Sequence, residues 1–263
     1  MASSGTATPP KAAARTERVL RLLSLAGLIA AWWIAAQITR NPALLPAPET
    51  VARFAWHEIL TGELPRALVI TLARVAAAFT LAMVLGAAAG YLAGCSTRAN
   101  AVLDPLLVIA LNIPVLIIII LAYLWIGLND LAAILAVSLA KLPTVMVTVR
   151  EGTRALDPRL AELSAIYRLP RLRWWRHIVL PQLAPYLAAA GRSGLSITWK
   201  IVLIVELLGR PDGVGFALNM FFQNFNVAGI LAYGLSFSAL MLFVEALVLQ
   251  PWEQRAHAWR HAA

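Results

Sequence analysis

The stretch ALVITLARVAAAFTLAMVLGAAAGYLAG, residues 67–94, decides the fold class. Its single charged residue is Arg74, and residues 75–94, which follow it, carry no charge. A helix needs roughly 17–25 predominantly apolar residues to cross the hydrocarbon core of a bilayer. This stretch therefore predicts a transmembrane helix and makes the chain an integral membrane protein.

The overall composition agrees. In 263 residues, 60% are hydrophobic and 13% are charged, and the mean hydropathy is +0.75, whereas soluble domains have about 45–50% apolar and about 25% charged residues. The net charge of +9 comes from basic residues at the ends of hydrophobic runs. Cytoplasmic loops and anionic lipid explain such residues, so no nucleic-acid partner is expected. The single cysteine, Cys95, excludes an intrachain disulfide and a multi-cysteine metal site.

Six apolar runs meet the length of a span, so we predict an all-α bundle of six transmembrane helices. The runs are 22–38, 67–94, 105–128, 131–149, 183–208 and 229–249. The corresponding division of the chain is a mobile cytosolic tail (1–18), the first span (19–40), a periplasmic interfacial segment (41–65), the core (66–250) and a second tail (251–263). The first run is too long for a signal peptide and is expected to remain as an anchor.

Two further patterns concern packing at the edges and in the middle of the bundle. In the interfacial segment, apolar residues recur at near-helical spacing, which favours an amphipathic helix at the outer surface; they are Val51, Phe54, Ala55, Ile59 and Leu60. In the second span, Gly86, Gly90 and Gly94 form a ridge of small residues that lets another helix approach closely. Packing within one bundle is favoured over a dimer face.

The distribution of arginines predicts the topology. The loop 150–182 contains seven of them, whereas the connection 127–130 contains none. The seven are Arg150, Arg154, Arg159, Arg168, Arg171, Arg173 and Arg176. The positive-inside rule places this loop in the cytosol, and six spans then place both termini there.

The same loop predicts a short helix with one apolar face. Asp157 followed by Pro158 is a typical helix start. Leu160, Leu163 and Ile166 then form an apolar stripe, and a basic aromatic segment, RLRWWRHIV (171–179), leads into the fifth span. From the residues alone, the loop either docks on a partner protein or lies on anionic lipid.

Charges inside the spans mark a candidate translocation path, because each is costly unless it is paired or faces water. On a helical wheel, several polar positions of the fifth span fall within about a third of its circumference, which predicts one polar stripe. The candidates for the path are Asn112, Lys141, Arg192, Ser196, Lys200 and Glu206. As an alternative, Arg192 snorkels to headgroups and Glu206 lies at the outer surface. Pro114 and Pro143 are expected to bend their helices.

The segment AELSAIYRLPRLRWWRHIVLPQLAPYL (161–187) resembles the cytosolic loop of binding-protein-dependent ABC importer permeases. Glu162 matches the glutamate of that pattern, Leu180-Pro181 matches its end, and Arg168 replaces its glycine. Residues 46–259 also resemble the nitrate, sulfonate and taurine permeases, and five segments carry this similarity. They are LLPAPETV (44–51), TLARV (71–75), AYLWIGLND (122–130), REGTRALDPRL (150–160) and VELLGRPDGVG (205–215).

The resemblance implies a type I importer bundle with cytosolic coupling helices in a bacterial inner membrane. It implies two ATP-binding cassette ATPase subunits, a second permease, identical or homologous, and a periplasmic or lipid-anchored solute-binding protein. The implied ATPase-coupling residues are Asp157, Arg159, Leu160, Glu162, Leu163, Ser164, Ile166, Arg168, Leu180 and Pro181. At the position of the family's glycine, a left-handed Arg168 would cost roughly 1–2 kcal/mol.

The sequence has no GxxxxGK[ST] pattern, the loop with which many ATPases bind the phosphates of ATP. The chain is therefore expected to be a non-enzymatic pore subunit without a cofactor of its own. ATP and Mg²⁺ are expected on the partner ATPases. The alternatives are an ion-coupled secondary carrier and a membrane-embedded enzyme. The histidines are scattered, and no metal-ligand spacing recurs on one span. Because Lys141, Arg192 and Lys200 outnumber Glu206, we expect a small anionic solute.

Overall fold

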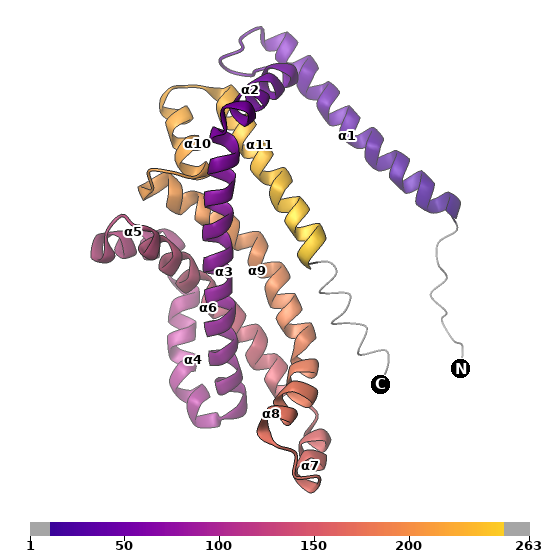
Figure 1. Ribbon diagram of the computed structural model, residues 1–263, viewed down its shortest axis with the longest axis vertical. Helices are drawn as coiled ribbons and strands as arrows, with labels where there is room; N and C mark the ends of the chain where they lie inside the picture. The colour runs from indigo at the N-terminus through magenta and orange to yellow at the C-terminus, as the bar shows by residue number, and fades with distance from the viewer. Residues whose placement is uncertain (1–10, 250–263) are drawn as a thin grey trace.

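The computed structural model describes residues 11–249 of the chain, and within that range all regular structure is helical. Four long helices run along the length of the molecule (Figure 1). They are α3 (Glu63–Cys95), α6 (Asp130–Arg154), α9 (Leu180–Gly209) and α11 (Val227–Val244). All four contain a stretch that is long and apolar enough to cross a membrane, which confirms four of the predicted spans as helices.

The most extensive helix contact is between α3 and α6. A Cβ added at Gly86 would lie 2.7 Å from the Cβ of Val145, and one added at Gly90 would lie 2.6 Å from the carbonyl oxygen of Met146. Gly94 faces Thr153 in the same way. The glycine ridge therefore packs within the bundle, as predicted, and it brings the two backbones together without side chains between them.

The α9 helix packs against both α6 and α3. Near the start of α9, Tyr186 covers Gly152, where any Cβ would collide with the ring. Further along, the two helices enclose fully buried apolar side chains, including Val137, Val202 and Val205. Phe237 of α11 completes this core.

The third predicted span is not one straight helix. It is divided between α4 (Thr97–Asn112) and α5 (Val115–Ile126), which meet at an angle of 99°. Ile113 is extended, and Pro114 has no N–H with which to continue the helix. The prediction of a bend here is confirmed, and the pair is compatible with one broken span or with a re-entrant loop. The helix α5 lies across the long helices (Figure 1).

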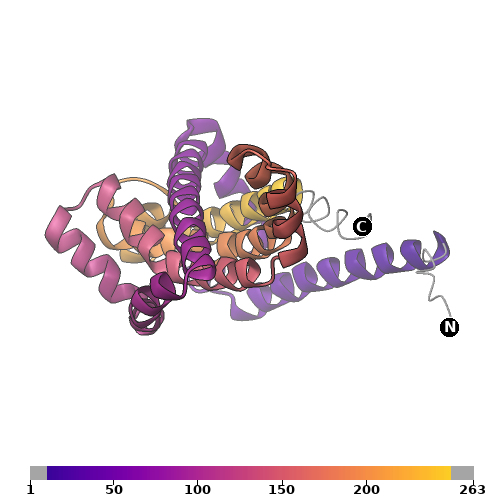
Figure 2. The same cartoon turned by 90° about the horizontal axis from the view of Figure 1, so that it is seen from below.

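Two helices precede the bundle. The first, α1 (Lys11–Thr39), leans away from the rest (Figures 1 and 2), and its apolar part, Leu23–Thr39, is shorter than that of the four long helices. It begins inside the segment 1–18, so the expected tail is helical where the structure describes it. The second, α2 (Pro48–Thr61), confirms the predicted amphipathic helix. The Trp32 indole N–H donates to the Pro46 carbonyl at 3.1 Å and links α1 to the start of α2.

The connection between α9 and α11 contains a further helix, α10 (Val214–Gln223). Its sequence, VGFALNMFFQ, is apolar but too short to cross a membrane. The described helices therefore number four candidate spans, or five when α4 and α5 count as one broken span. The tail 251–263 lies outside the described residues.

Candidate functional site

The loop 150–182 contains a capped helix that is attached to the first turn of α9. Asp157 accepts a hydrogen bond from the backbone N–H of Arg159 at 2.9 Å, so it caps α7 (Pro158–Ile166) as predicted. Its own backbone N–H donates to the Gln182 side-chain oxygen at 2.9 Å. This second bond joins the start of α7 to the first turn of α9.

Arg168 takes the left-handed conformation, with φ of +48°. The backbone N–H of Leu169 donates to the carbonyl of Ser164 at 3.0 Å, and this bond spans the turn that ends α7. The turn that glycine would make is therefore kept, at a conformational cost of roughly 1–2 kcal/mol for a residue that carries a Cβ.

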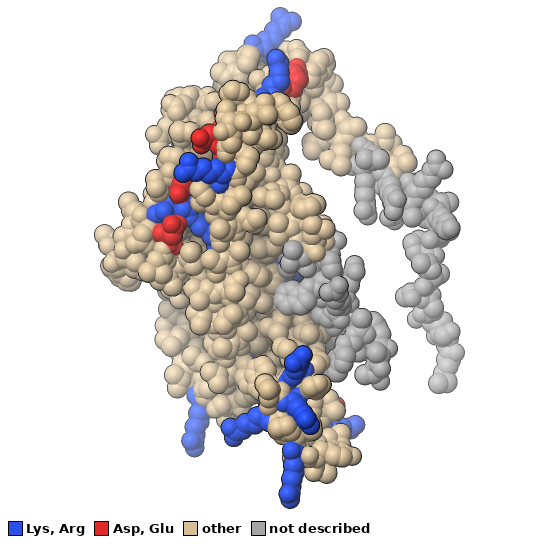
Figure 3. Space-filling view, viewed as in Figure 1, with Lys and Arg blue, Asp and Glu red and all other residues tan. Residues whose placement is uncertain are grey.

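Most of the predicted coupling residues lie on α7, and several of their apolar side chains are exposed. Leu163 is 47% exposed and Ile166 is 75% exposed, and Glu162 beside them is exposed as well. Leu180, on the first turn of α9, is also exposed, whereas Leu160 and Pro181 are half-buried. Figure 3 shows that this end of the molecule is rich in Lys and Arg. A partner that binds here needs an apolar groove and acidic groups around it.

A buried ion cluster lies toward the other end of the bundle and centres on Arg74, which is 6% exposed. Its Nη1 donates to Glu206 Oε1 at 2.8 Å, and its Nε donates to Asp130 Oδ1 at 2.7 Å. Its Nη2 pairs with the carboxylate of Asp212, and Nη1 also reaches the Asp212 carbonyl at 3.0 Å. One guanidinium thus joins α3, α6, α9 and the segment before α10.

Glu206 is fully buried in this cluster. Besides Arg74, its carboxylate accepts hydrogen bonds from the Thr71 hydroxyl at 2.8 Å and from the Gly215 N–H at 2.9 Å. The Thr71 oxygen in turn accepts from the N–H of Val214 at 2.8 Å. The first turn of α10 is therefore fixed by a carboxylate and a hydroxyl, which satisfy N–H groups that a helix start leaves open.

The single polar stripe predicted for α9 is wrong. Lys200 lies on an exposed face and Arg192 is exposed with it, whereas Glu206 points into the protein. Ser196 is half-buried. Trp199 packs on Phe237, with 5.7 Å between ring centroids. A helical wheel gives the angular positions of residues around one helix but does not show where neighbouring helices lie. The arc predicted to be polar therefore includes both exposed and buried positions of α9.

The ion cluster was not predicted from the sequence, although its members lie in segments that carry the family resemblance. Arg74 and Thr71 belong to TLARV, Asp130 ends AYLWIGLND, and Glu206 and Asp212 belong to VELLGRPDGVG. A lone arginine in one span and a lone glutamate in another was the available signal, because buried charges in membranes are paired.

The other two predicted path residues differ in exposure. Asn112 is exposed, and its side chain donates to the Val108 carbonyl at 2.7 Å. Lys141 is 2% exposed, and its Nζ has no hydrogen-bond partner among the residues that the structure describes. Within the same residues, no group of three metal-ligating side chains is found.

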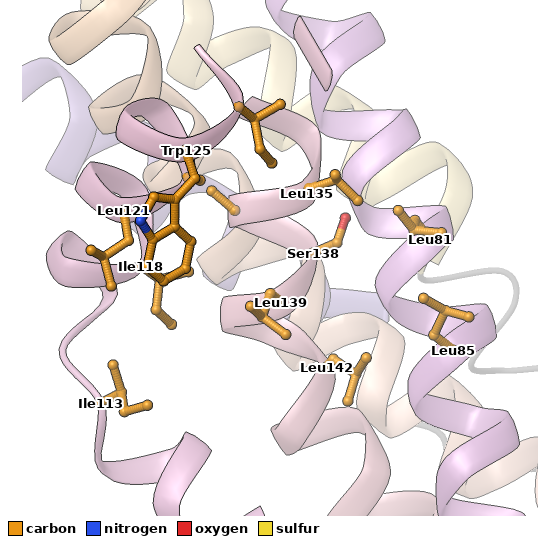
Figure 4. Close-up of a pocket in the computed structure, with 13 residues that line it drawn as sticks. Leu81, Leu85, Ile113, Ile118, Leu121, Trp125, Leu135, Ser138, Leu139 and Leu142 are labelled. Carbon is orange, nitrogen blue, oxygen red and sulfur yellow. The ribbon is translucent and has the colours of Figure 1, made fainter. Parts of the chain in front are cut away.

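A pocket of about 410 Å³ opens between α5, α6 and α3 (Figure 4). Trp125 of α5, Leu139 of α6 and Leu85 of α3 line it, and Ser138 is the polar residue among those that the figure labels. The Ser138 hydroxyl is already bonded to the carbonyls of Ile134, at 2.6 Å, and Ala78, at 3.1 Å. The pocket therefore offers nothing to a charged solute.

Residues 82–249 match the family model described as a binding-protein-dependent transport system inner membrane component. The chain belongs to this permease family. Among its relatives, the putative aliphatic sulfonates transport permease protein SsuC of Bacillus subtilis is 30% identical, over 92% of this chain and 87% of the relative. The taurine transport system permease protein TauC of Escherichia coli is 24% identical, over 91% and 89%.

Two further comparisons extend the match. The bicarbonate transport system permease protein CmpB of Synechococcus elongatus is 25% identical, over 70% of this permease and 67% of the relative. Of the solved structures, the inward-facing MetNI methionine ABC transporter has a matching chain with a TM-score of 0.62 at 18% identity, covering 76% of the permease and 98% of that chain. At that identity the likeness shows the fold alone.

Family membership decides between the alternatives that the residues left open. The permease is a multi-pass pore subunit of an ABC importer and not an enzyme, and ATP is hydrolysed by separate subunits. The membrane-embedded enzyme and the ion-coupled carrier are thereby excluded.

Proposed function

We propose that this permease forms half of the conduit of an ATP-driven importer for a small organic or inorganic anion. The observation that carries the proposal is the exposed face of α9, where the charged residues in the spanning helix, Arg192 and Lys200, are both basic. A charged side chain on a spanning helix has to face water or a protein partner rather than lipid. A water-filled path lined by positive charge lowers the barrier for anions more than for cations.

The chemistry of the relatives' solutes supports the same class. Aliphatic sulfonates, taurine and bicarbonate are named for three of them, and each solute carries an anionic group. A solute of this kind, delivered by a periplasmic or lipid-anchored binding protein, is proposed for this permease. Lys200 is proposed as a path residue, with Nζ 5.5 Å from the centroid of the Trp199 ring. Ser196 and Asn112, both at least partly exposed, are retained as candidates.

The assembly is proposed as two permeases and two ATPase subunits. Each α7 would dock on an ATPase through Leu163 and Ile166, with Glu162 meeting a basic group at the edge of the contact. The exposure of these apolar side chains supports this role, because an exposed apolar patch rimmed by charge marks a protein contact. The chain itself is proposed to hold no cofactor, and ATP with Mg²⁺ would bind the partner subunits.

Six spans are proposed, with α1 as the first and the bent pair α4 and α5 as the third. The arginines of the loop 150–182 then lie in the cytosol, and both termini lie there too. The second permease is proposed to be an identical copy, with a homologue as the alternative.

Reconstitution tests the proposal. The permease, its ATPase and its binding protein are assembled in proteoliposomes, and ATP-dependent uptake is measured for ethanesulfonate, taurine and bicarbonate, with a cationic amino acid for comparison. Uptake of at least one anion is expected, together with co-purification of the ATPase. A complex that imports only the cation, or a permease that transports without an ATPase, would overturn it.

A further inference from the structure

Lys141 is a buried cation without a counter-charge. It is 2% exposed on α6, and its Nζ finds no partner in the part of the chain that the structure describes. Arg74 is nearly as buried, but it is paired with three carboxylates. An unpaired ammonium inside a membrane protein costs several kcal/mol, so its retention calls for a functional reason.

Among the residues that the structure describes, the side chains around Lys141 give its Nζ no hydrogen bond. Its Cε lies 3.2 Å from where a Cβ at Gly194 would stand, and the ring of Phe79 lies 3.3 Å from the same point. On the same two helices, the Ser138 hydroxyl donates to carbonyls and the Thr198 hydroxyl donates to the carbonyl of Gly194 at 2.8 Å, and neither oxygen accepts a hydrogen bond from Lys141. On the side toward Arg74, the space lined by Val137 and Val202 is too narrow to hold a water molecule.

The contact that covers Lys141 is locally weak on both helices. On α6, Pro143 lacks the N–H that would bond the carbonyl of Leu139, so the helix loses a hydrogen bond next to Lys141. On α9, the covering residue is Gly194, with Gly191 and Ala190 buried in the turn before it. Because Gly194 carries no side chain, α9 covers Lys141 with backbone, and no side chain at this position would have to be displaced if the two helices part.

Next to Gly194, the exposed face of α9 belongs to the proposed path. Gly194 is buried, but its neighbour Ser193 is exposed, on the same face of α9 as Lys200. Residues 193 and 200 are seven apart, which places them two helical turns from each other on one face. A gap between α6 and α9 at Gly194 would therefore present Lys141 to the side that already carries Lys200.

We infer that Lys141 is a gated anion-binding group, hidden behind Gly194 in the conformation described here and exposed to the conduit when α6 and α9 part. Its ligand is the anionic group of the solute, a sulfonate, carboxylate or bicarbonate, which supplies the counter-charge that the interior lacks. Because this ligand pairs with Lys141 only in the parted arrangement, it stabilises that arrangement. The inference rests on the proposed function, of which it names the internal solute contact.

Thiol labelling tests the gate directly, because Cys95 is the sole cysteine and Cys95→Ser gives a cysteine-free background. In that background, Lys141→Cys, Lys200→Cys and Val137→Cys are reconstituted with the ATPase and the binding protein. They are labelled with the anionic reagent 2-sulfonatoethyl methanethiosulfonate. At rest, Lys141→Cys is expected to react about tenfold more slowly than Lys200→Cys, and ATP with loaded binding protein is expected to raise its rate by about tenfold.

Val137→Cys is the matched control, one turn away on α6 and 1% exposed, and it is expected to stay slow under both conditions. Ethanesulfonate at saturating concentration is expected to protect Lys141→Cys during turnover. Equal labelling of Lys141→Cys with and without ATP, or a rise that Val137→Cys shares, overturns the gate.

A rescue experiment separates charge from packing. Lys141→Met is expected to raise the melting temperature of the permease while lowering anion import per ATP by about tenfold, a combination that a purely structural residue would not give. In Lys141→Cys, modification with 2-aminoethyl methanethiosulfonate restores an ammonium and is expected to restore import, whereas ethyl methanethiosulfonate is not. Restoration by both reagents or by neither refutes the role of the charge.

The two levels of proposal fail differently. A wild-type complex that imports only cations overturns the proposed function itself. Wild-type anion import that Lys141→Met leaves unchanged overturns only the inference about Lys141.

Discussion

Replacement of Glu206 by glutamine is expected to destabilise the permease by about 3 kcal/mol, at the lower end of the roughly 3–5 kcal/mol lost when a buried ion pair is broken. The buried carboxylate accepts three hydrogen bonds, from Arg74, Thr71 and Gly215. An amide keeps one oxygen for these donors but turns its NH₂ toward another donor. The estimate stays low because Arg74 retains Asp130 and Asp212.

Melting of the purified permease in detergent, followed by tryptophan fluorescence, measures the effect. At about 2–4 °C per kcal/mol for a chain of this size, Glu206→Gln is expected to lower the melting temperature by about 6–12 °C. The control is Asp130→Asn, because Asp130 pairs with the same guanidinium but is 57% exposed. Exposed pairs contribute about 0–1 kcal/mol, so its shift should stay below about 4 °C. Equal shifts for the two variants would show that burial of the pair does not matter.

The remaining predictions concern coupling, charge in the path and helix packing. Glu162→Lys and Leu163→Asp are expected to leave membrane insertion and dimer formation intact but to weaken ATPase co-purification and abolish solute-stimulated ATP hydrolysis. As a control, Arg173→Ala should have only a small effect on both. Full ATPase binding by the first two variants would favour the lipid-surface interpretation of the loop. Lys200→Ala should lower anion uptake in proteoliposomes without loss of the ATPase from the complex, and unchanged uptake would remove Lys200 from the path. Gly90→Ala places a Cβ 2.6 Å from the Met146 carbonyl oxygen, so it is expected to cost about 1–3 kcal/mol in the same melting assay. Gly234→Ala, on a helix with open space around it, should cost nothing, and equal shifts would contradict close contact at the ridge.

Composition and local pattern predicted the elements whose cause is local. The residues after Arg74 are uncharged over the length of a span, and α3 follows from that alone. The cap at Asp157 depends on a side chain and a backbone N–H two residues away, so the sequence specifies it directly. The glycine ridge of α3 was also readable, because a row of small residues has packing as its usual explanation.

Features that depend on a neighbour were not predictable in the same way. Pro114 indicates a bend but not its 99° angle, which depends on where α5 finds apolar contact. Glu206 and Lys200 occupy similar positions on a helical wheel, yet Glu206 pairs with Arg74 and Lys200 lies on an exposed face. A wheel of α9 could not show this difference, because Arg74 is 132 residues away from Glu206 in the chain. The start of the short helix α10 is stabilised by hydrogen bonds from its first N–H groups to Thr71 and Glu206. Both acceptors lie on other helices, so the sequence of α10 alone does not predict these bonds.

The turn that joins the cytosolic segment to α9 has a mechanical consequence. The residues Trp175–Val179 form a π-helical turn rather than a break, so a single helix of 39 residues runs from Arg171 to Gly209. At about 1.5 Å per residue it is roughly 58 Å long, and a tilt of about 5° displaces one end by about 5 Å relative to the other. Gln182, eleven residues after its first residue, ties it to the start of α7, and Glu206 lies near its other end. The loop before α9 and the start of α10 are therefore joined by one continuous helix, so a displacement of one is transmitted to the other.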